Sequence, residues 1–256
     1  MFTRAIVRIP AANFATGETT VDLGEPVFAH VLKQHARYCE VLKLCGLQLR
    51  VLEADPDYPD STFVEDAAVL TAKGVVLTRP GAASRAGEVE RIRAAIESEF
   101  TNVRKIEAPG TLDGGDICGA GDHFFIGISQ RTNAAGAEQL AAMLRSDGYT
   151  CSTVDIRDMT SILHLKSGIA YLGDNQLVVM KEMADRPEFA GYERILVRPE
   201  ESYAANCLRL NDAVLMPAGY PHLQAQLEQR GHKVIPLDMS EFRKMDGGLS
   251  CLSLRW

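Results

Sequence analysis

The sequence lacks the features of disordered, membrane-spanning and exported chains. No polar tract is long enough to indicate disorder, because 46% of the 256 residues are hydrophobic and 24% are charged. No apolar stretch approaches the ~20 residues that a bilayer span requires. The short apolar run at the N-terminus is interrupted by Arg8, so it predicts a first β-strand rather than a signal peptide.

Basic clusters and paired cysteines are also absent. The 27 Lys and Arg residues stand against 34 Asp and Glu residues, and they form no run, which argues against a nucleic-acid partner. The acidic surplus is compatible with a small cationic substrate. The six cysteines are scattered without a Cys-x-x-Cys pair. We therefore predict reduced thiols in a cytoplasmic protein, with neither a zinc knuckle nor a disulfide framework.

Two further absences concern domain organisation and zinc chemistry. No Pro/Gly/Ser-rich linker divides the chain, so we predict a single domain over residues 1–256. None of the six histidines has a second histidine four positions away with a glutamate between them. A zinc hydrolase is therefore the least favoured class of enzyme.

The clearest pattern that the sequence does contain is a repeated hairpin of apolar strand, tight polar turn and apolar strand. Gly, Asn and Asp occupy the turns, as expected where the backbone needs positive φ. Four segments have this layout: Ala67–Thr78, Gly115–Ile128, Gly168–Lys181 and Ala204–Met216.

Helical patterns follow the first, second and fourth hairpins, and another helix is predicted to begin with Pro26 in its first turn. Single strands are predicted at Gln48–Leu52 and Lys233–Leu237. The unit of strand, hairpin and helix recurs about every 40–50 residues, a period typical of propellers and solenoids. An ordinary α+β sheet whose hairpins recur by chance is the alternative.

Unusual polar residues lie at corresponding places in this repeat. Acidic residues or a histidine precede the first three hairpins, and an arginine follows the first two. If the modules form a ring, these side chains converge on its axis. The residues are Asp60, Glu65, Asp66, Arg85, Asp113, Asp116, Arg131 and His164.

Each of these residues also has an ordinary structural explanation. Asp113-Gly-Gly-Asp116 is a capped turn, His164 is a hydrogen-bonded histidine in an apolar strand, and Cys251 is a buried thiol. Glu65 and Asp66 are less ordinary, because two carboxylates that open a buried strand cost desolvation energy unless a cation meets them.

Considered together, seven motifs resemble one family. They run from Asp60-Ser-Thr-Phe-Val-Glu65-Asp66, Thr78–Arg85, Thr111–Asp116 and Gln130–Asn133 through Leu163–Ser167 and Tyr203–Cys207 to Met245-Asp-Gly-Gly-Leu-Ser-Cys251. In this order they resemble the dimethylarginine dimethylaminohydrolases of the guanidino-modifying superfamily. The resemblance implies an α/β fold, a five-bladed pentein propeller of ββαβ modules around a polar channel, with the chain ends sharing the fifth blade.

The resemblance also implies an activity, namely hydrolysis of Nω-methylated arginines to citrulline and a methylamine without a metal or an organic cofactor. Cys251 corresponds to the nucleophile, His164 to the general acid and base, and Asp113 to the carboxylate that orients His164. The small-molecule substrate is the implied partner, with neither nucleic acid nor membrane. A homodimer is compatible with the family, and the sequence leaves the oligomeric state open.

The remaining implied roles concern substrate binding. Asp60, Glu65 and Asp66 would grip the cationic substrate, with Asp66 at the guanidinium. Arg85 and Arg131 would hold the substrate carboxylate, and Met245 would offer a backbone contact. Residues 11–24 correspond to a lid in which family members often place a leucine over the substrate. Glu18 stands at that place here and can contact substrate through its backbone carbonyl.

The chemistry is consistent with these residue types. A thiolate suits attack on a resonance-stabilised guanidinium carbon, and an imidazole can protonate the leaving amine and then activate water. An arginine deiminase or an amidinotransferase would use the same groups, although those enzymes are usually longer than 256 residues. A non-catalytic propeller that binds a protein or a ribosome is the alternative from a different class.

Overall fold

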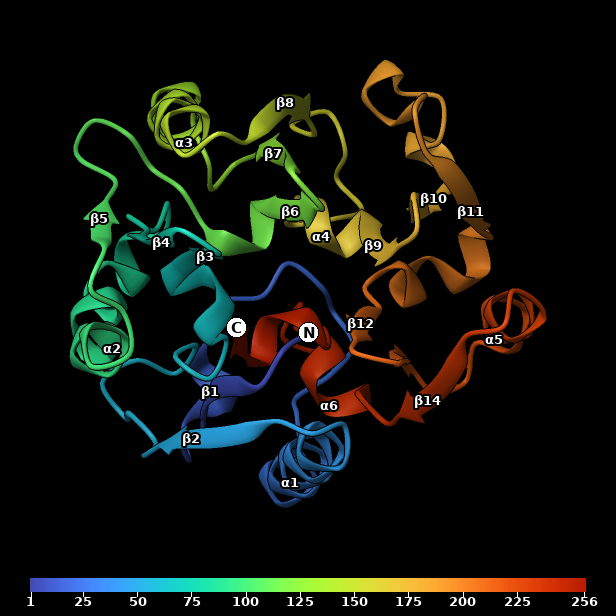
Figure 1. Ribbon diagram of the computed structural model, residues 1–256. Helices are drawn as coiled ribbons and strands as arrows, with labels where there is room; N and C mark the ends of the chain where they lie inside the picture. The colour runs from blue at the N-terminus through green and yellow to red at the C-terminus, as the bar shows by residue number, and fades with distance from the viewer.

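Five three-stranded sheets form a ring in the computed structural model, which describes all 256 residues (Figure 1). In four sheets a hairpin supplies the first two strands, and the third strand pairs in parallel with the second. These sheets are β3 (Ala68–Thr71), β4 (Gly74–Leu77) and β5 (Val103–Lys105); β6 (Ile117–Ala120), β7 (His123–Ile128) and β8 (Thr150–Asp155); β9 (Ile169–Gly173), β10 (Gln176–Met180) and β11 (Glu193–Val197); and β12 (Leu208–Leu210), β13 (Ala213–Pro217) and β14 (Lys233–Leu237).

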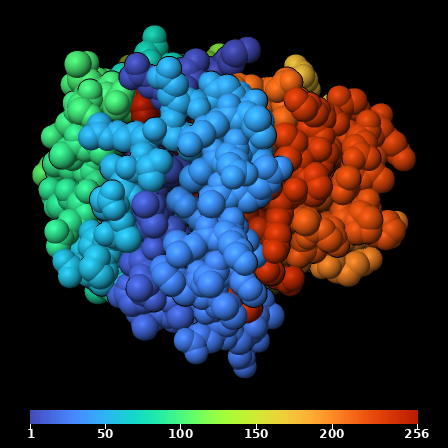
Figure 2. Space-filling model, turned by 90° about the horizontal axis from the view of Figure 1, so that it is seen from below, coloured from blue at the N-terminus to red at the C-terminus, as the bar shows by residue number.

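The fifth sheet joins the two ends of the chain. Its central strand β1 (Arg4–Arg8) pairs in parallel with β2 (Gln48–Leu52) and antiparallel with β15 (Leu254–Arg255). In the view from below, the blue residues of the N-terminal module lie directly beside the red residues of the C-terminal part (Figure 2). The predicted five-bladed propeller, with a blade shared by the chain ends, is therefore confirmed.

Helices cover the outside of the ring in four modules (Figure 1). They are α1 (Phe28–Leu44), α2 (Glu88–Glu97), α3 (Ala134–Ser146) and α5 (Pro221–Gln229). In the β9–β10–β11 module, two short 3-10 turns at Lys181–Met183 and Pro187–Phe189 replace the helix, in agreement with the missing helical pattern there. Two shorter helices are α4 (Leu165–Gly168) and α6 (Ser240–Arg243). None of the helices combines the length and the apolar character that crossing a bilayer would require.

The four predicted hairpins are all present, and their turn residues explain them. Gly121, Gly173, Asp174, Asn175 and Asn211 have positive φ, which Gly, Asn and Asp tolerate better than other residues. The single strands Gln48–Leu52 and Lys233–Leu237 also match β2 and β14.

Two local predictions are wrong. The first helix begins at Phe28 rather than at Pro26, because Val27 is still extended and its backbone N–H donates to the Glu241 carboxylate at 2.7 Å. His164 does not lie in a strand. It immediately precedes the short helix α4, whose first residue, Leu165, donates its backbone N–H to a carboxylate oxygen of Asp116 at 3.0 Å.

The core consists of five clusters of buried side chains, and each cluster joins two neighbouring modules. One cluster, for example, packs Ile6 of β1 and Leu254 of β15 against Val75 of β4 and Ile92 of α2. The others bridge the remaining pairs of neighbours in the same way. Burial between modules thus stabilises the ring, since apolar contacts dominate the favourable energy of folding.

Candidate active site

Short helical turns line the centre of the ring, and each precedes the first strand of a hairpin or the closing strand β15. Neighbouring turns pack against one another around the axis. Because equivalent positions of a repeated module meet at its axis, polar residues on these turns come together. The five turns are Val64–Ala67, Gly114–Asp116, α4, Pro199–Ala205 and Ser250–Leu252.

A small cavity of ≈ 20 Å³ lies on one side of this inner ring. The structure brings eight of the ten predicted site residues to its wall. Asp113 lies behind His164, and only Glu65 is directed elsewhere. The lining residues are Glu18, Asp60, Phe63, Asp66, Arg85, Arg131, Leu163, His164, Met245, Asp246, Gly247 and Cys251.

His164 and Asp113 form a buried pair. The Nε2 atom of His164 lies 3.3 Å from Oδ2 of Asp113, whose other oxygen accepts the backbone N–H of Gly81 at 2.9 Å. Burial alone would lower the pKa of His164, but the charge of Asp66 and the hydrogen bond that the imidazole donates to Asp113 outweigh it and raise the pKa to about 9. The imidazole is therefore protonated at neutral pH and can donate a proton.

Asp66 is a second buried carboxylate beside His164. It accepts the backbone N–H of Gly115 at 2.8 Å and an Nη1–H of Arg85 at 2.6 Å. Burial would raise the pKa of Asp66, but the charges of His164 and Arg85 prevail and lower it to about 2. Arg85 also binds Glu88 through Nε at 2.9 Å and Nη2 at 2.7 Å, so most of its donors have partners within the chain.

The double glycine between Asp113 and Asp116 permits this close packing. A Cβ atom on Gly114 would lie 2.0 Å from the backbone oxygen of Glu65. A Cβ atom on Gly115 would lie 2.7 Å from Nδ1 of His164 and 2.8 Å from Oδ1 of Asp66. Glycine is therefore required here by space, since neither residue has positive φ.

Cys251 is half-buried on the turn Ser250–Leu252, and the preceding loop is held from the neighbouring module. Tyr203 donates its hydroxyl to the backbone oxygen of Gly247 at 2.8 Å. Asn206 accepts the backbone N–H of Ser250 and donates to its hydroxyl, both at 3.1 Å. Burial, followed by the negative charges of Glu65 and Asp66, raises the pKa of the Cys251 thiol to about 12.

The predicted lid lies over the cavity and is fastened to it at Glu18. The backbone N–H of Glu18 donates to Oδ2 of Asp60 at 3.0 Å, and its carboxylate pairs with Nη2 of Arg131 at 2.6 Å. Thr20 then donates its backbone N–H to Asp246 at 2.5 Å. The lid segment thus contacts the same loop that carries Met245 and leads to Cys251.

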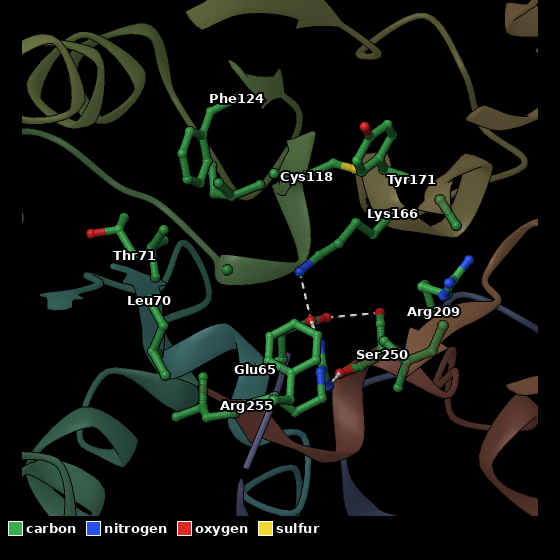
Figure 3. Close-up of a pocket in the computed structure, with 18 of the residues that line it drawn as sticks. Glu65, Leu70, Thr71, Cys118, Phe124, Lys166, Tyr171, Arg209, Ser250 and Arg255 are labelled. Carbon is green, nitrogen blue, oxygen red and sulfur yellow. Dashed lines mark hydrogen bonds and ion pairs between the residues drawn. The ribbon is translucent and has the colours of Figure 1, made fainter. Parts of the chain in front are cut away.

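Glu65 faces a different, larger cavity of ≈ 720 Å³ (Figure 3). Its carboxylate accepts hydrogen bonds from Ser250 at 2.8 Å and Arg255 at 3.2 Å, and it pairs with Lys166 at 2.6 Å. These cations compensate the buried charge within the chain. The position of Glu65 therefore does not match the expectation that its side chain grips the substrate. Asp66, in contrast, lines the smaller cavity.

Several residues to which the sequence assigns no individual role support the site. Asp116 accepts the hydroxyls of Ser129 and Thr132 at 2.7 Å and 2.6 Å and fixes the backbone after His164. Tyr203 and Asn206, which belong to the motif Tyr203–Cys207, hold the loop that leads to Cys251. Their polar character within an apolar segment is the signal in the sequence.

One group of side chains has the spacing of metal ligands. Ligand atoms of Asp66, Asp113 and His164 all lie within 4.8 Å of one another. Each carboxylate already accepts a backbone N–H, and the His164 imidazole, with a pKa of about 9, is a proton donor rather than an electron-pair donor near neutral pH. The arrangement favours sharing of a proton over binding of a metal ion.

Known proteins share both the sequence and this geometry. A family model described as arginine deiminase matches residues 47–199. The N(G),N(G)-dimethylarginine dimethylaminohydrolase of Pseudomonas aeruginosa is 45% identical over 257 residues, which span 100% of both chains. The protein of the same name from Streptomyces coelicolor is 36% identical, over 98% of this chain and 96% of its own.

A solved structure agrees with the sequence relatives. It is a mutant of the Pseudomonas aeruginosa enzyme complexed with citrulline, and it is 44% identical to this chain. The two structures align over 100% of both chains with a TM-score of 0.97. The resemblance seen in the seven motifs thus extends over the whole chain and its fold. The chain belongs to the dimethylarginine dimethylaminohydrolase family.

Proposed function

We propose that this chain hydrolyses Nω,Nω-dimethyl-L-arginine and Nω-methyl-L-arginine to L-citrulline and dimethylamine or methylamine. The observation that carries the proposal is the convergence of a half-buried thiol, an imidazole paired with a carboxylate, and two buried acids on one cavity. The relatives named as dimethylarginine dimethylaminohydrolases and the citrulline complex of one of them support the same substrate class.

Binding would place the guanidinium between Asp66 and Cys251. Asp66, whose pKa is about 2, carries a full negative charge at neutral pH and can hold the cation. At the other end, Arg131 is better suited to the substrate carboxylate than Arg85, because Arg85 is already engaged by Asp66 and Glu88. Asp60 and the backbone near Glu18 and Met245 line the path between the two ends.

The reaction would then proceed in two halves. The Cys251 thiol, stabilised as a thiolate by the bound cation, loses its proton to solvent and attacks the guanidinium carbon. His164 donates its own proton to the amine, which leaves as the C–N bond breaks. The covalent thiouronium that remains is attacked by water, from which neutral His164 takes a proton. Collapse of this intermediate breaks the C–S bond, releases citrulline and returns the thiol. Asp113 orients the imidazole and stabilises its charged form, as the aspartate does in a Ser–His–Asp triad.

Activation of the thiol would depend on the substrate itself. Burial, together with the carboxylates that attract a cation, raises the pKa of Cys251 to about 12, so few molecules carry a thiolate at neutral pH. A guanidinium placed between the sulfur and Asp66 favours the thiolate by direct charge attraction. The site would thus form its nucleophile when a cation of the correct shape is bound.

The test is citrulline formation from asymmetric dimethylarginine, monomethylarginine and arginine. Cys251→Ser and His164→Ala should each reduce turnover by at least about 10³-fold while circular dichroism shows the native fold. Cys39→Ser is the matched control, because it removes a half-buried thiol from α1, away from the cavity. Full citrulline formation by Cys251→Ser would contradict the proposed role of Cys251, whereas absence of citrulline formation by the wild-type chain would favour the non-catalytic propeller.

A deiminase-like specificity is the second candidate, favoured by the arginine deiminase family model that matches residues 47–199. The same residues would then release ammonia from unmodified arginine. Measuring ammonia against dimethylamine in the same assay separates the two. A higher kcat/KM for arginine than for either methylated substrate would establish the deiminase.

The proposal includes a reducing, cytoplasmic setting. All six cysteines are free thiols in the structure, and the proposed mechanism needs Cys251 in the reduced form. Trapping of thiols with an alkylating reagent in intact cells, followed by mass spectrometry, should find Cys251 reduced.

A further inference from the structure

The lid residue Glu18 forms an ion pair with Arg131, the arginine that the substrate carboxylate would need. Its Oε2 atom lies 2.6 Å from Nη2 of Arg131. The Arg131 side chain is 13% exposed and that of Glu18 is 42% exposed, so the pair sits at the mouth of the cavity rather than on open surface. A carboxylate from the chain therefore already stands where a carboxylate from the substrate is expected.

Further contacts fix the Glu18 carboxylate in this position. Its Oε1 atom accepts the hydroxyl of Ser84, and the backbone N–H of Glu18 donates to Asp60 at 3.0 Å. The hydrogen bond from Ser84 and the charge of Arg131 together lower the pKa of Glu18, against the opposing effect of burial. Glu18 is thus an anion at neutral pH, with the same charge and planar shape as the carboxylate of an amino acid.

The cavity offers no equivalent cation in place of Arg131. Arg85 is buried, and it donates to both oxygens of Glu88 as well as to Asp66. The His164 imidazole is paired with Asp113. A ligand carboxylate that enters the site therefore meets the Glu18 carboxylate at Arg131.

We propose that Glu18 is a specificity-determining residue that competes with the substrate carboxylate for Arg131. The inference rests on the proposed function. A guanidine that bears an amino-acid carboxylate binds only when the Glu18 carboxylate leaves Arg131, and this exchange costs binding energy. A guanidine without a carboxylate leaves the pair intact and avoids that cost. Glu18 thereby reduces the preference for guanidines that bear an amino-acid carboxylate over guanidines that lack one, because specificity is the difference between two affinities.

A second lid contact supplies a control for general loosening of the lid. The Thr20 hydroxyl donates to Asp246 at 3.0 Å and 3.1 Å, and the Thr20 backbone makes a separate hydrogen bond to the same carboxylate. Thr20→Val removes only the hydroxyl and leaves Arg131 paired with Glu18. It therefore weakens lid closure without changing the competition.

The experiment measures binding by calorimetry in a Cys251→Ser background, which prevents turnover. The probes are asymmetric dimethylarginine and a butyl-dimethylguanidine, which has the same guanidinium without the amino-acid group. Glu18→Gln should lower the Kd of dimethylarginine about two- to fivefold, the range of a partly exposed ion pair, and change that of the butyl compound by less than about 1.5-fold. Thr20→Val should change both Kd values by the same factor.

A double-mutant cycle with Arg131→Gln then assigns the effect to this pair. The gain from Glu18→Gln should vanish when Arg131 is replaced, because no cation remains to compete for. Weaker binding of dimethylarginine by Glu18→Gln, equal changes for both probes, or a gain that persists without Arg131 would overturn the proposal. So would a failure of the Glu18→Gln protein to bind any probe that bears a carboxylate.

Failure of the proposed function can be distinguished from failure of this proposal about Glu18. If the wild-type chain forms no citrulline from methylated arginines, the same comparison is made with L-arginine and butylguanidine. The effect of Glu18 on ligands with and without a carboxylate is then still measured, independently of which arginine the enzyme hydrolyses.

Discussion

The charges on a few side chains set the chemistry that the site can perform. Burial and two nearby acids raise the pKa of Cys251 to about 12, whereas His164 lies among acids that overcome the effect of burial and raise its pKa to about 9. Without a bound cation, both groups therefore carry their protons at neutral pH. The same acids that suppress the nucleophile attract the cation that would release it, so binding and activation are coupled.

Alkylation of Cys251 by iodoacetamide tests this coupling. Because the pKa of the Cys251 thiol is about 12, its alkylation should be slow at pH 7. The rate should rise with pH up to the pH at which the protein unfolds. Guanidinium chloride at millimolar concentration should move the profile to lower pH, because a cation beside the sulfur stabilises the thiolate. Urea has the same shape without charge and should have no effect. Mass spectrometry that follows Cys251 alone should show identical profiles with both additives if the coupling is absent.

Among the elements, the turn Gly114–Asp116 packs closely against the side chains of His164 and Asp66 and against the neighbouring turn Val64–Ala67. Its two glycines have different neighbours. Gly114 packs against the backbone of Glu65, which cannot move without shifting the adjacent turn. Gly115 packs against the side chains of His164 and Asp66, so added bulk there would displace functional groups.

Alanine at each glycine should separate stability from activity. We expect Gly114→Ala to lower the free energy of unfolding by about 1–3 kcal/mol through overpacking. Gly115→Ala should keep more of that stability but lose about 10²-fold in kcat/KM, because His164 is pushed from its position. Gly191→Ala is the control, since a Cβ atom there has no neighbour within 4 Å. Denaturant unfolding and citrulline assays on the three variants measure both quantities, and equal loss of activity at Gly114 and Gly115 would refute the distinction.

The sequence predicts those strands and helices whose limits depend on residues close to them in the chain. The hairpins follow from turn residues such as Asn211 and Gly121, which tolerate positive φ. The start of α1 does not follow, because it depends on the contact between Val27 and Glu241, which are 214 positions apart. The direction of Glu65 likewise depends on Lys166 and Arg255 from other modules. Periodicity along the chain carries no information about such distant partners.

At the scale of the whole molecule, the ring depends on contacts between modules. Each of the five core clusters contains residues of two neighbouring modules, and β15 closes the ring on β1. A module on its own would expose half of two clusters. We therefore propose that residues 1–256 fold as one cooperative domain, because no part of the ring buries its apolar surface independently.

Unfolding followed by two probes tests this cooperativity. The only tryptophan, Trp256, packs against the cluster shared by the first two modules, whereas Leu227 is fully buried on α5 in the cluster shared by the last two. Leu227→Ala should destabilise the protein by about 2–5 kcal/mol. In one cooperative domain, Trp256 fluorescence and far-ultraviolet circular dichroism should shift together to the same lower midpoint. Leu196→Ala, at a position 45% exposed on β11, should leave both midpoints unchanged. A tryptophan transition that keeps its wild-type midpoint in Leu227→Ala would show instead that the ring unfolds in separate parts.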